Sequence, residues 1–319
     1  MFIVKEKELI SVVITTYNRV ELLKKSLNSV INQTYKNIEI IVADNHSTDG
    51  TDKLLEEYTK QDNRIKYFRH SENIGMTNNT TFAHSKITGK YFHVLCDDDW
   101  LDKDFIEKSY EEFKKHPDYS FIAPTAWLYD ISGDIILKGP TVMLDDNSIG
   151  NRIQNYIIAN RNNSVITNGL LKTSLLKSML KEDGFALKCR FGEDWVFVAK
   201  FLIAGKCKMI NSTHYHKLHD GATSRIKTMS ELWDITGINA KNMYYKIAET
   251  INDSISNDNF CKNRLNVKQR RECAQKVAEG INTIISQNHL KYFLLSPSTY
   301  FGKIGKVINF VTKYLIIGY

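Results

Sequence analysis

The sequence contains few of the residues that mark disulfide scaffolds, zinc-binding motifs or flexible linkers. Only four prolines occur in 319 residues, so no proline-rich linker separates two domains. The cysteines are odd in number, scattered and without CxxC spacing; they are Cys96, Cys189, Cys207, Cys261 and Cys273. This usage is typical of reduced thiols in a cytoplasmic protein, and it favours neither a disulfide framework nor a zinc site.

Long hydrophobic runs are also missing. No stretch reaches the roughly 18–20 apolar residues that a helix needs to span a bilayer. The start, Met1–Glu8, mixes acidic and basic residues and leads straight into a strand-like run, which is unlike a secretory signal peptide. With 42% hydrophobic and 25% charged residues, the composition is that of an ordinary globular protein. We therefore expect a cytoplasmic protein with a full hydrophobic core.

Positive charge is concentrated toward the C-terminus. The segment after Gly221 carries the positive excess of the whole chain, and from Lys291 onward there are four lysines and no Asp or Glu. No aromatic-basic RNA motif or recognition helix accompanies this basic end, so we expect no nucleic-acid partner. Apolar residues from Ile304 to Ile317 follow helical spacing with lysines nearby, as in a basic amphipathic helix. Such a helix either makes a peripheral contact with the inner face of the cell membrane, or packs on its own domain or on the second subunit of a homodimer.

Strand and helix patterns alternate in the first hundred residues. Four apolar runs rich in β-branched residues predict buried strands: Ser11–Tyr17, Ile38–Ala43, Ile65–Arg69 and Tyr91–Leu95. Helical spacing follows Asn18 and recurs from about Thr51 to Gln61. This β-α-β-α-β order predicts an α/β fold, a Rossmann-like three-layer sandwich with a mostly parallel sheet.

Polar clusters follow three of the predicted strands, at Thr15–Arg19, Asp44–Asp49 and Asp97–Asp99. Ligands of parallel α/β sheets collect at the carboxyl ends of the strands. We therefore expect a binding site where these three clusters meet.

The rest of the chain changes from mixed to helical character. Strands are predicted at Phe121–Trp127, Ile135–Lys138 and Cys207–Ile210, and helices around Ile153–Ala159 and Val196–Ala204. After about Arg225 the pattern is helical, at Glu231–Ala248, Val267–Ser286 and the C-terminal tail. We therefore divide the chain into an α/β domain, residues 1–225, and a helical C-terminal region, residues 226–319, for acceptor, membrane or dimer contacts.

Three consecutive acids, Asp97, Asp98 and Asp99, stand directly after a buried strand. Adjacent carboxylates repel one another there unless a cation or hydrogen-bond donors compensate. Hard oxygen ligands suit Mg²⁺ or Mn²⁺, and Mg²⁺ typically combines one or two carboxylates with substrate phosphates. The alternative is a solvated loop that caps a helix beginning near Asp102. The position at the end of a parallel strand favours a metal site.

A second acidic pair, Glu193-Asp194, opens a predicted helix. A helix N-terminus stabilises anions, so these residues are either plain capping acids or a carboxylate held for general-base work. Further along, His214, His216 and His219 surround Tyr215. A lone histidine is more often structural than a ligand.

Five motifs follow one another in an order and spacing that resembles the family 2 glycosyltransferases of GT-A fold. They are SVVITTYNR, VADNHSTDGT, NIGMTNN, GKYFHVLCDDDW and FGEDW, and the resemblance covers roughly residues 9–225. It implies a nucleotide-sugar donor, usually a UDP-sugar, a divalent cation and most often inversion at the anomeric carbon. The acceptor would be a hydroxyl of a glycan or a lipid-linked glycan in the synthesis of surface polysaccharide, lipopolysaccharide or another glycoconjugate.

The resemblance also implies roles for individual residues. The base and ribose would be contacted by Thr15, Tyr17 and Arg19, and the uracil imide would donate to Asp44, since an ionised carboxylate accepts strongly from N–H. The remaining assignments are ribose and metal for Asp97 and Asp98, direct metal ligation first of all for Asp99, metal or phosphate for His219, diphosphate for Ser224 and Arg225, general base for Asp194, and acceptor binding for Glu193.

Two departures from the family pattern affect this assignment. Cys96 stands where many members have another acid, so the choice among the three aspartates is open by one position. The common arginine after the NxG stretch is missing, because Asn78 and Asn79 occupy its place. We expect Asn79 to lie at the donor, with Arg69 as a substitute for the missing charge.

Two other functions compete with glycosyl transfer. A nucleotidyltransferase that builds sugar nucleotides usually opens with a Gly-rich phosphate loop, and SVVITTYNR has no glycine. A catalytically silent sugar-nucleotide-binding module would not need Asp98, Asp99 and Asp194. Their presence favours an enzyme.

Overall fold

The computed structural model describes residues 7–159, 168–184, 192–218 and 240–293 of the chain. Two compact units are present, and each is described by itself. The first comprises residues 1–141, 165–189 and 207–227, and the second residues 142–164, 190–206 and 228–319. This structural division does not test what each part of the chain does, so the functional division at residue 225 stays a prediction.

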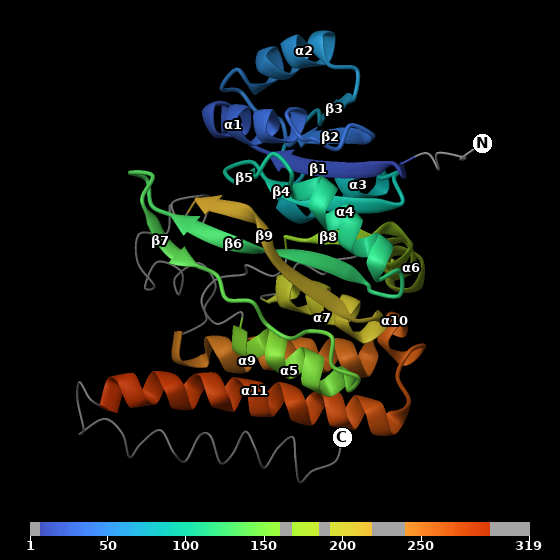
Figure 1. Cartoon of the computed structure of the whole chain (residues 1–319), viewed down its shortest axis with the longest axis vertical. Coiled ribbons are helices and arrows are strands. Elements are labelled where there is room, and N and C mark those ends of the chain that lie inside the picture. Colours follow the sequence, from blue (N-terminus) through green and yellow to red (C-terminus); the bar gives the residue numbers. More distant parts are fainter. Residues whose placement is uncertain (1–6, 160–167, 185–191, 219–239, 294–319) are drawn as a thin grey trace. The chain divides into compact units, whose positions relative to one another are not determined.

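One sheet runs through the first unit (Figure 1). Its strands are β1 (Ile10–Thr16), β2 (Ile38–Asp44), β3 (Ile65–Arg69), β4 (Tyr91–Cys96), β5 (Trp100–Leu101), β6 (Phe121–Tyr129), β7 (Ile135–Lys138), β8 (Leu170–Lys172) and β9 (Cys207–Leu218). Their order is β3-β2-β1-β4-β8-β6-β9-β5, with β7 beside β6. The first four strands pair in parallel, as do β6 and β9, whereas β5, β7 and β8 pair antiparallel to their neighbours. The predicted α/β fold with a largely parallel sheet is confirmed.

Strand β1 lies inside this sheet, between β2 and β4, and is buried on both faces. Side chains alternate between the two faces of a strand, and in β1 both Val12 and its neighbour Val13 are fully buried. Val12 and Ile14 cluster with Leu23 and Leu27 of a following helix, α1 (Val20–Ile31). The other helices of the unit are α2 (Thr51–Gln61), α3 (Met76–Ser85), α4 (Phe105–Lys115) and α6 (Thr173–Asp183). Because such strands need no polar face, they read as continuous apolar runs in the sequence.

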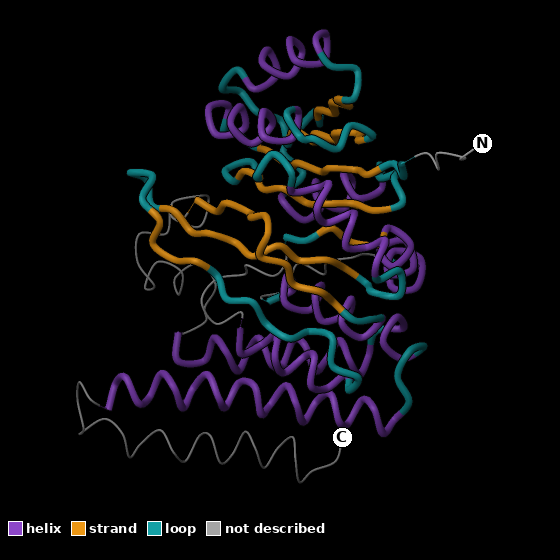
Figure 2. Tube along the Cα trace, viewed as in Figure 1, coloured by secondary structure: helices purple, strands orange, loops and turns teal. Residues whose placement is uncertain are grey.

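The described part of the second unit is helical, as Figure 2 shows by colour. Its helices are α5 (Ile149–Ala159), α7 (Glu193–Ala204), α9 (Ala240–Asn257), α10 (Asn259–Lys262) and α11 (Val267–Phe293). A buried ion pair joins α7 to the start of α10, since Lys200 Nζ lies 2.9 Å from Asp258 Oδ2. The Arg152 guanidinium of α5 donates to the Leu202 carbonyl near the C-terminal end of α7. Within the residues described, no helix is both long and apolar enough to cross a membrane.

The predicted elements agree with the structure except at their ends. The strand expected at Cys207–Ile210 continues to Leu218, and the helix expected from Val196 begins at Glu193. The helices α3 and α6 and the short strands β5 and β8 were not predicted. The amphipathic tail from Ile304 to Ile317 and the first residues of the helix expected at Glu231 lie outside the described residues.

A buried carboxylate ties the amino-terminal ends of the parallel strands together. Glu39 of β2 accepts hydrogen bonds from Ser11 Oγ of β1 (2.5 Å), from Lys66 Nζ of β3 (2.6 Å) and from the Thr88 backbone and hydroxyl just before β4 (both 2.8 Å). Burial raises the pKa of Glu39, but these donors outweigh it and lower the pKa to about 2. A single ionised side chain therefore links four neighbouring segments.

This arrangement predicts a pH-dependent loss of stability when Glu39 is replaced by Gln. Because the pKa is lower in the folded chain than its ordinary value of 4.5, ionised Glu39 stabilises the fold fully above about pH 4.5, and this contribution disappears as the pH falls through about 2. We expect Glu39→Gln to lower the free energy of unfolding by roughly 2–3 kcal/mol at pH 7. Urea unfolding at pH 7, 5 and 3 measures this, with Glu56→Gln on the exposed surface of α2 as the control. A deficit that stays constant across this range would contradict the prediction.

Candidate donor and metal site

The register of the parallel strands brings the three polar clusters to one edge. Thr16 of β1 lies opposite Asp44 of β2, and Thr15 lies opposite Cys96 of β4. The segments that follow these residues therefore begin side by side at the carboxyl end of the sheet. The pairing of these strands therefore brings the three predicted polar clusters to the same edge.

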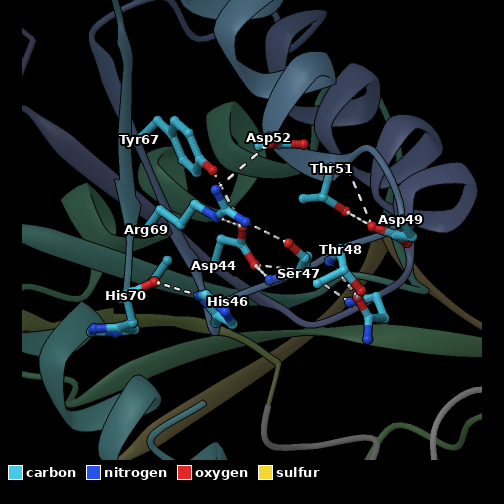
Figure 3. A network of polar contacts seen from close by, with 12 residues as sticks. Asp44, His46, Ser47, Thr48, Asp49, Thr51, Asp52, Tyr67, Arg69 and His70 are labelled. Carbon is cyan, nitrogen blue, oxygen red and sulfur yellow. Dashed lines mark hydrogen bonds and ion pairs between the residues drawn. The ribbon is translucent and has the colours of Figure 1, made fainter. Parts of the chain in front are cut away.

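Asp44 is the centre of a polar network at this edge, shown in Figure 3. Its side chain is fully buried. Oδ1 accepts from the Ser47 amide (2.9 Å) and hydroxyl (2.5 Å), Oδ2 accepts from the Tyr67 hydroxyl (3.2 Å), and Arg69 Nε lies 3.7 Å from Oδ2. Burial, followed by the charge of Asp44, raises the pKa of Tyr67, which keeps the phenol protonated as a donor. These contacts hold the Asp44 carboxylate in a fixed orientation.

The loops after β1 and β2 are locked to each other. The Asn18 amide donates to Ser47 Oγ (2.8 Å), and the Thr48 amide donates to Asn18 Oδ1 (2.8 Å). Asn18 and His46 both adopt left-handed backbone angles, with φ of 53° and 70°. Non-glycine residues in this region carry strain, which tends to persist at binding sites because the surrounding contacts over-determine it. These hydrogen bonds and backbone angles therefore hold the two loops together at this edge of the sheet.

Asn79 lies on α3 and supports the same edge from within the fold. Its amide nitrogen donates to the Ala43 carbonyl (3.0 Å), and its Oδ1 lies 3.0 Å from His70 Nε2. The side chain is 2% exposed. These contacts of Asn79 are with other parts of the protein, and its contact with the donor remains a prediction.

Arg19 lies against the acid triplet. Its Nη1 is 2.9 Å from Asp97 Oδ1 and 3.1 Å from Asp98 Oδ2, so one nitrogen bridges two carboxylates. Burial raises the pKa of Asp97, and the charge of Arg19 opposes that rise without cancelling it. The guanidinium predicted to contact base or ribose therefore compensates the triplet in this structure.

Asp99 is held mainly by neutral donors. Tyr215 donates its hydroxyl to Oδ2 (2.5 Å), and the Leu218 amide donates to Oδ1 (2.9 Å). Burial, followed by the charge of Asp98, raises the pKa of Asp99 to about 7. Both carboxylate oxygens of the residue first expected to bind metal thus already accept hydrogen bonds from β9.

Cys96, Asp98 and Asp99 offer one ligand atom each, all within 4.8 Å of one another. Two carboxylates are suitable donors for Mg²⁺ or Mn²⁺, which commonly complete their coordination with water and substrate phosphate. The thiol of Cys96 is a softer donor that these hard ions do not select. Asp98 and Asp99 therefore suit a hard divalent cation, which would bind to their two carboxylates.

A histidine pair fixes the strand that follows the triplet. His216 Nε2 lies 2.8 Å from Asp102 Oδ1 and His214 Nδ1 lies 3.1 Å from Asp102 Oδ2. The His216 ring stacks on Trp100 with an angle of 4° between the planes, and Tyr129 bonds to its Nδ1 at 2.9 Å. Burial lowers the pKa of His216 against the opposing effect of Asp102. These two histidines have structural roles, in line with the expectation for most histidines.

Glu193 and Asp194 belong to the second unit, where they form the first turn of α7. Glu193 is buried and Asp194 is exposed. Gly192 precedes them with a left-handed φ of 82°, and a Cβ there would lie 3.2 Å from Ile247 Cγ1. Asp194 is therefore an accessible carboxylate at a helix N-terminus, where the helix dipole stabilises its charge.

The remaining predicted site residues fall into two groups. Thr15 is half-buried at the end of β1, where it pairs with Ala43, and Tyr17 is 44% exposed just beyond it. His219, Ser224 and Arg225 lie outside the described residues. The roles of both groups in binding remain predictions.

Sequence reasoning did not identify the residues that hold the acids in place. Tyr67 and Ser47 hold Asp44, Asn18 joins the two loops, and Tyr215 holds Asp99. Ser47 stands three residues after Asp44, the spacing of a local side-chain turn. Tyr215 is 116 positions from Asp99, and nothing local in the sequence indicates that contact.

Residues 11–166 match the family described as Glycosyl transferase family 2. A relative from Streptococcus pneumoniae named glycosyltransferase GlyA is 35% identical over 107 residues, which is 34% of this chain and 15% of the relative. A Campylobacter jejuni relative named GalNAc(5)-diNAcBac-PP-undecaprenol beta-1,3-glucosyltransferase is 38% identical over 93 residues, 29% of this chain and 30% of the relative. The chain thus spans less than a third of either relative.

Solved structures agree with this assignment at the level of fold. S. aureus TarS 1-349 in complex with UDP-GlcNAc gives a TM-score of 0.53 at 17% identity, covering 85% of this chain and 81% of that chain. A mannosyltransferase from Pyrobaculum calidifontis, solved in complex with GDP-Man and Mn²⁺, gives 0.50 at 14% identity, covering 96% and 87%. Residues 11–166 are therefore similar to family 2 glycosyltransferases, and the fold is that of the GT-A structures that the chain resembles.

The contact between Tyr215 and Asp99 predicts unequal effects of two tyrosine substitutions. Tyr215→Phe removes a donor from a buried carboxylate, so we expect it to lower the free energy of unfolding by about 1–3 kcal/mol. Tyr129→Phe makes the same chemical change in a hydrogen bond to the neutral ring of His216 that is only part-buried, and we expect a smaller loss. Urea unfolding at pH 8 compares the two, and equal losses would contradict the proposed dependence of Asp99 on Tyr215.

Proposed function

We propose that this protein transfers a sugar from a nucleoside diphosphate to an acceptor hydroxyl, with a divalent cation and with inversion at the anomeric carbon. The observation that supports this most directly is the convergence of the Asp44 network, Arg19 and the acid triplet at one edge of a family 2 domain. A base pocket and a cation site side by side suit a donor with a base at one end and a diphosphate at the other.

A UDP-sugar is the donor that the Asp44 network favours. A carboxylate has about four acceptor positions on its two oxygens. The Ser47 and Tyr67 donors use three of them, so one remains for the imide N–H of uracil. UDP-GlcNAc in the TarS structure and GDP-Man in the mannosyltransferase support the nucleotide-sugar class for similar folds, and uracil carries an imide N–H that this position of Asp44 would accept.

Asp98 would hold the cation, with Asp99 as its second carboxylate. We place Asp98 first because both oxygens of Asp99 accept hydrogen bonds from β9, which reverses the order expected from the sequence. The cation neutralises charge on the departing diphosphate when bound. Tyr215 and the Leu218 amide fix the orientation of Asp99, and Thr15 and Tyr17 would contact the base and ribose of the donor.

Asp194 would take the proton from the acceptor hydroxyl. Inversion requires a base on the face of the sugar opposite the leaving group. Asp194 is exposed on the first turn of α7 and can meet an acceptor, whereas the buried Glu193 is suited to orienting the turn and the acceptor. His219, Ser224 and Arg225 complete the proposal as contacts to metal or diphosphate.

The acceptor is a separate part of the proposal. A glycan or a lipid-linked glycan is consistent with the undecaprenol-linked substrate in the name of the C. jejuni relative. Residues 226–319, with the basic tail, would then serve acceptor, peripheral membrane or dimer contacts. In this proposal the enzyme works in the cytoplasm or at the inner face of the membrane, in surface glycan synthesis.

Calorimetric titration with UDP, GDP and dTDP, each with and without Mn²⁺, tests the donor site. We expect UDP to bind most tightly, and Mn²⁺ to strengthen its binding at least about tenfold, within the usual range of coupling between two ligands. Asp98→Asn should remove the Mn²⁺ effect while leaving metal-free UDP binding in place. Preference for GDP or dTDP would contradict the proposed UDP-sugar donor, and no nucleotide binding would contradict the proposed function.

Substitution of Asp194 tests the catalytic step separately. We expect Asp194→Asn to lower kcat by about 10²–10⁴-fold, the usual contribution of a general base, with little change in the affinity for UDP. Product formation from a radiolabelled UDP-sugar measures this once an acceptor has been found. Asp183→Asn, at the end of α6 in the first unit, is the matched control. Transfer that survives Asp194→Asn unchanged would show that another group is the base.

A further inference from the structure

Arg19 occupies a position between the donor loops and the acid triplet. It stands at the N-terminal boundary of α1, directly after the loop that follows β1. Its side chain is 14% exposed, and those of Asp97 and Asp98 are 7% and 10% exposed. The contact is therefore a shielded ion pair, and such pairs are screened by salt much less than surface pairs.

The acids around Arg19 are compensated differently from one another. Neutral hydroxyl and amide groups hold both oxygens of Asp99. Lys25 of α1 lies over the Trp100 ring at 3.0 Å from its centroid, and its charge acts on Asp99. Arg19, by contrast, places a full positive charge within 3.1 Å of an Asp98 oxygen, and Asp98 is the carboxylate that the proposed function assigns to the cation.

A divalent cation and a guanidinium on the same carboxylate repel each other. The repulsion is strong because the surroundings are shielded from water. A diphosphate that enters the site relieves it in two ways, since it ligates the cation and accepts hydrogen bonds from arginine. The three charges are then compatible only when the nucleotide is present.

We propose that Arg19 is the internal counter-ion of the acid triplet and makes uptake of the divalent cation depend on the donor diphosphate. Without nucleotide, Arg19 compensates Asp97 and Asp98 and keeps the cation weakly bound. With nucleotide, the guanidinium turns from Asp98 to the diphosphate, and the cation takes its place. This inference rests on the proposed function, because it assumes that the triplet binds metal and that the edge binds a nucleoside diphosphate.

Mn²⁺ titrations followed by electron paramagnetic resonance test this, because the signal of free aqueous Mn²⁺ falls as the ion binds. The affinity is measured with and without saturating UDP, for the wild type, Arg19→Met and Arg19→Lys. For Arg19→Met we expect Mn²⁺ binding without UDP to tighten by about tenfold, and the enhancement by UDP to shrink by a similar factor. Arg19→Lys keeps a positive charge and should retain most of the coupling. Lys24→Met, an exposed charge on the same helix, controls for long-range electrostatics and should behave like the wild type.

The outcomes separate this inference from the proposed function. Wild-type protein that binds no Mn²⁺ even with UDP would contradict the proposed function and the inference together. Normal coupling in the wild type that is unchanged in Arg19→Met would overturn the inference alone. Weaker Mn²⁺ binding in Arg19→Met without UDP, in protein that melts at the wild-type temperature, would also overturn it, because Arg19 would then support the site without competing for it.

Discussion

The parallel pairing of β1 with β2 and with β4 is the constraint on which the candidate site depends. In this register Thr16 faces Asp44 and Thr15 faces Cys96. A shift of one residue would turn every side chain of a strand to the other face of the sheet. Glu39 stabilises the register at the opposite end of the strands, where it joins four segments. Binding chemistry at one edge is thus supported by a buried acid at the other.

The site gathers several acids in a confined space, and each is stabilised by a different means. Asp44 uses a serine and a tyrosine, Asp99 uses a tyrosine and a backbone amide, and Asp97 and Asp98 share Arg19. Buried charge is costly unless it is paired or hydrogen-bonded. Fixed neutral donors suit acids that must stay in place, whereas a mobile cation suits an acid that has to exchange partners.

Much of the fold could be predicted because the inner strands are buried on both faces and appear as nearly continuous apolar runs, as at Ile40–Ala43. The edge where Asp44 and Asp97 meet follows from strand order alone. The contacts of Asp99 could not be predicted, because Tyr215 comes from a strand more than a hundred positions away whose polar second half hides its strand pattern. The short strands β5 and β8 carry too few residues for periodicity to show.

The distant contact between Asp99 and β9 bears on where this domain ends. The family match stops at residue 166, yet β9 begins at Cys207 and lies between β6 and β5 in the sheet. A chain cut at the end of the match would lose the interior strands β8 and β9 and leave β4, β6 and β5 without these neighbours. It would also strip Asp99 of its tyrosine and amide donors. The segment recognised by similarity is therefore smaller than the unit that can fold around the site, and residues beyond it can change how the donor is held without touching the donor itself.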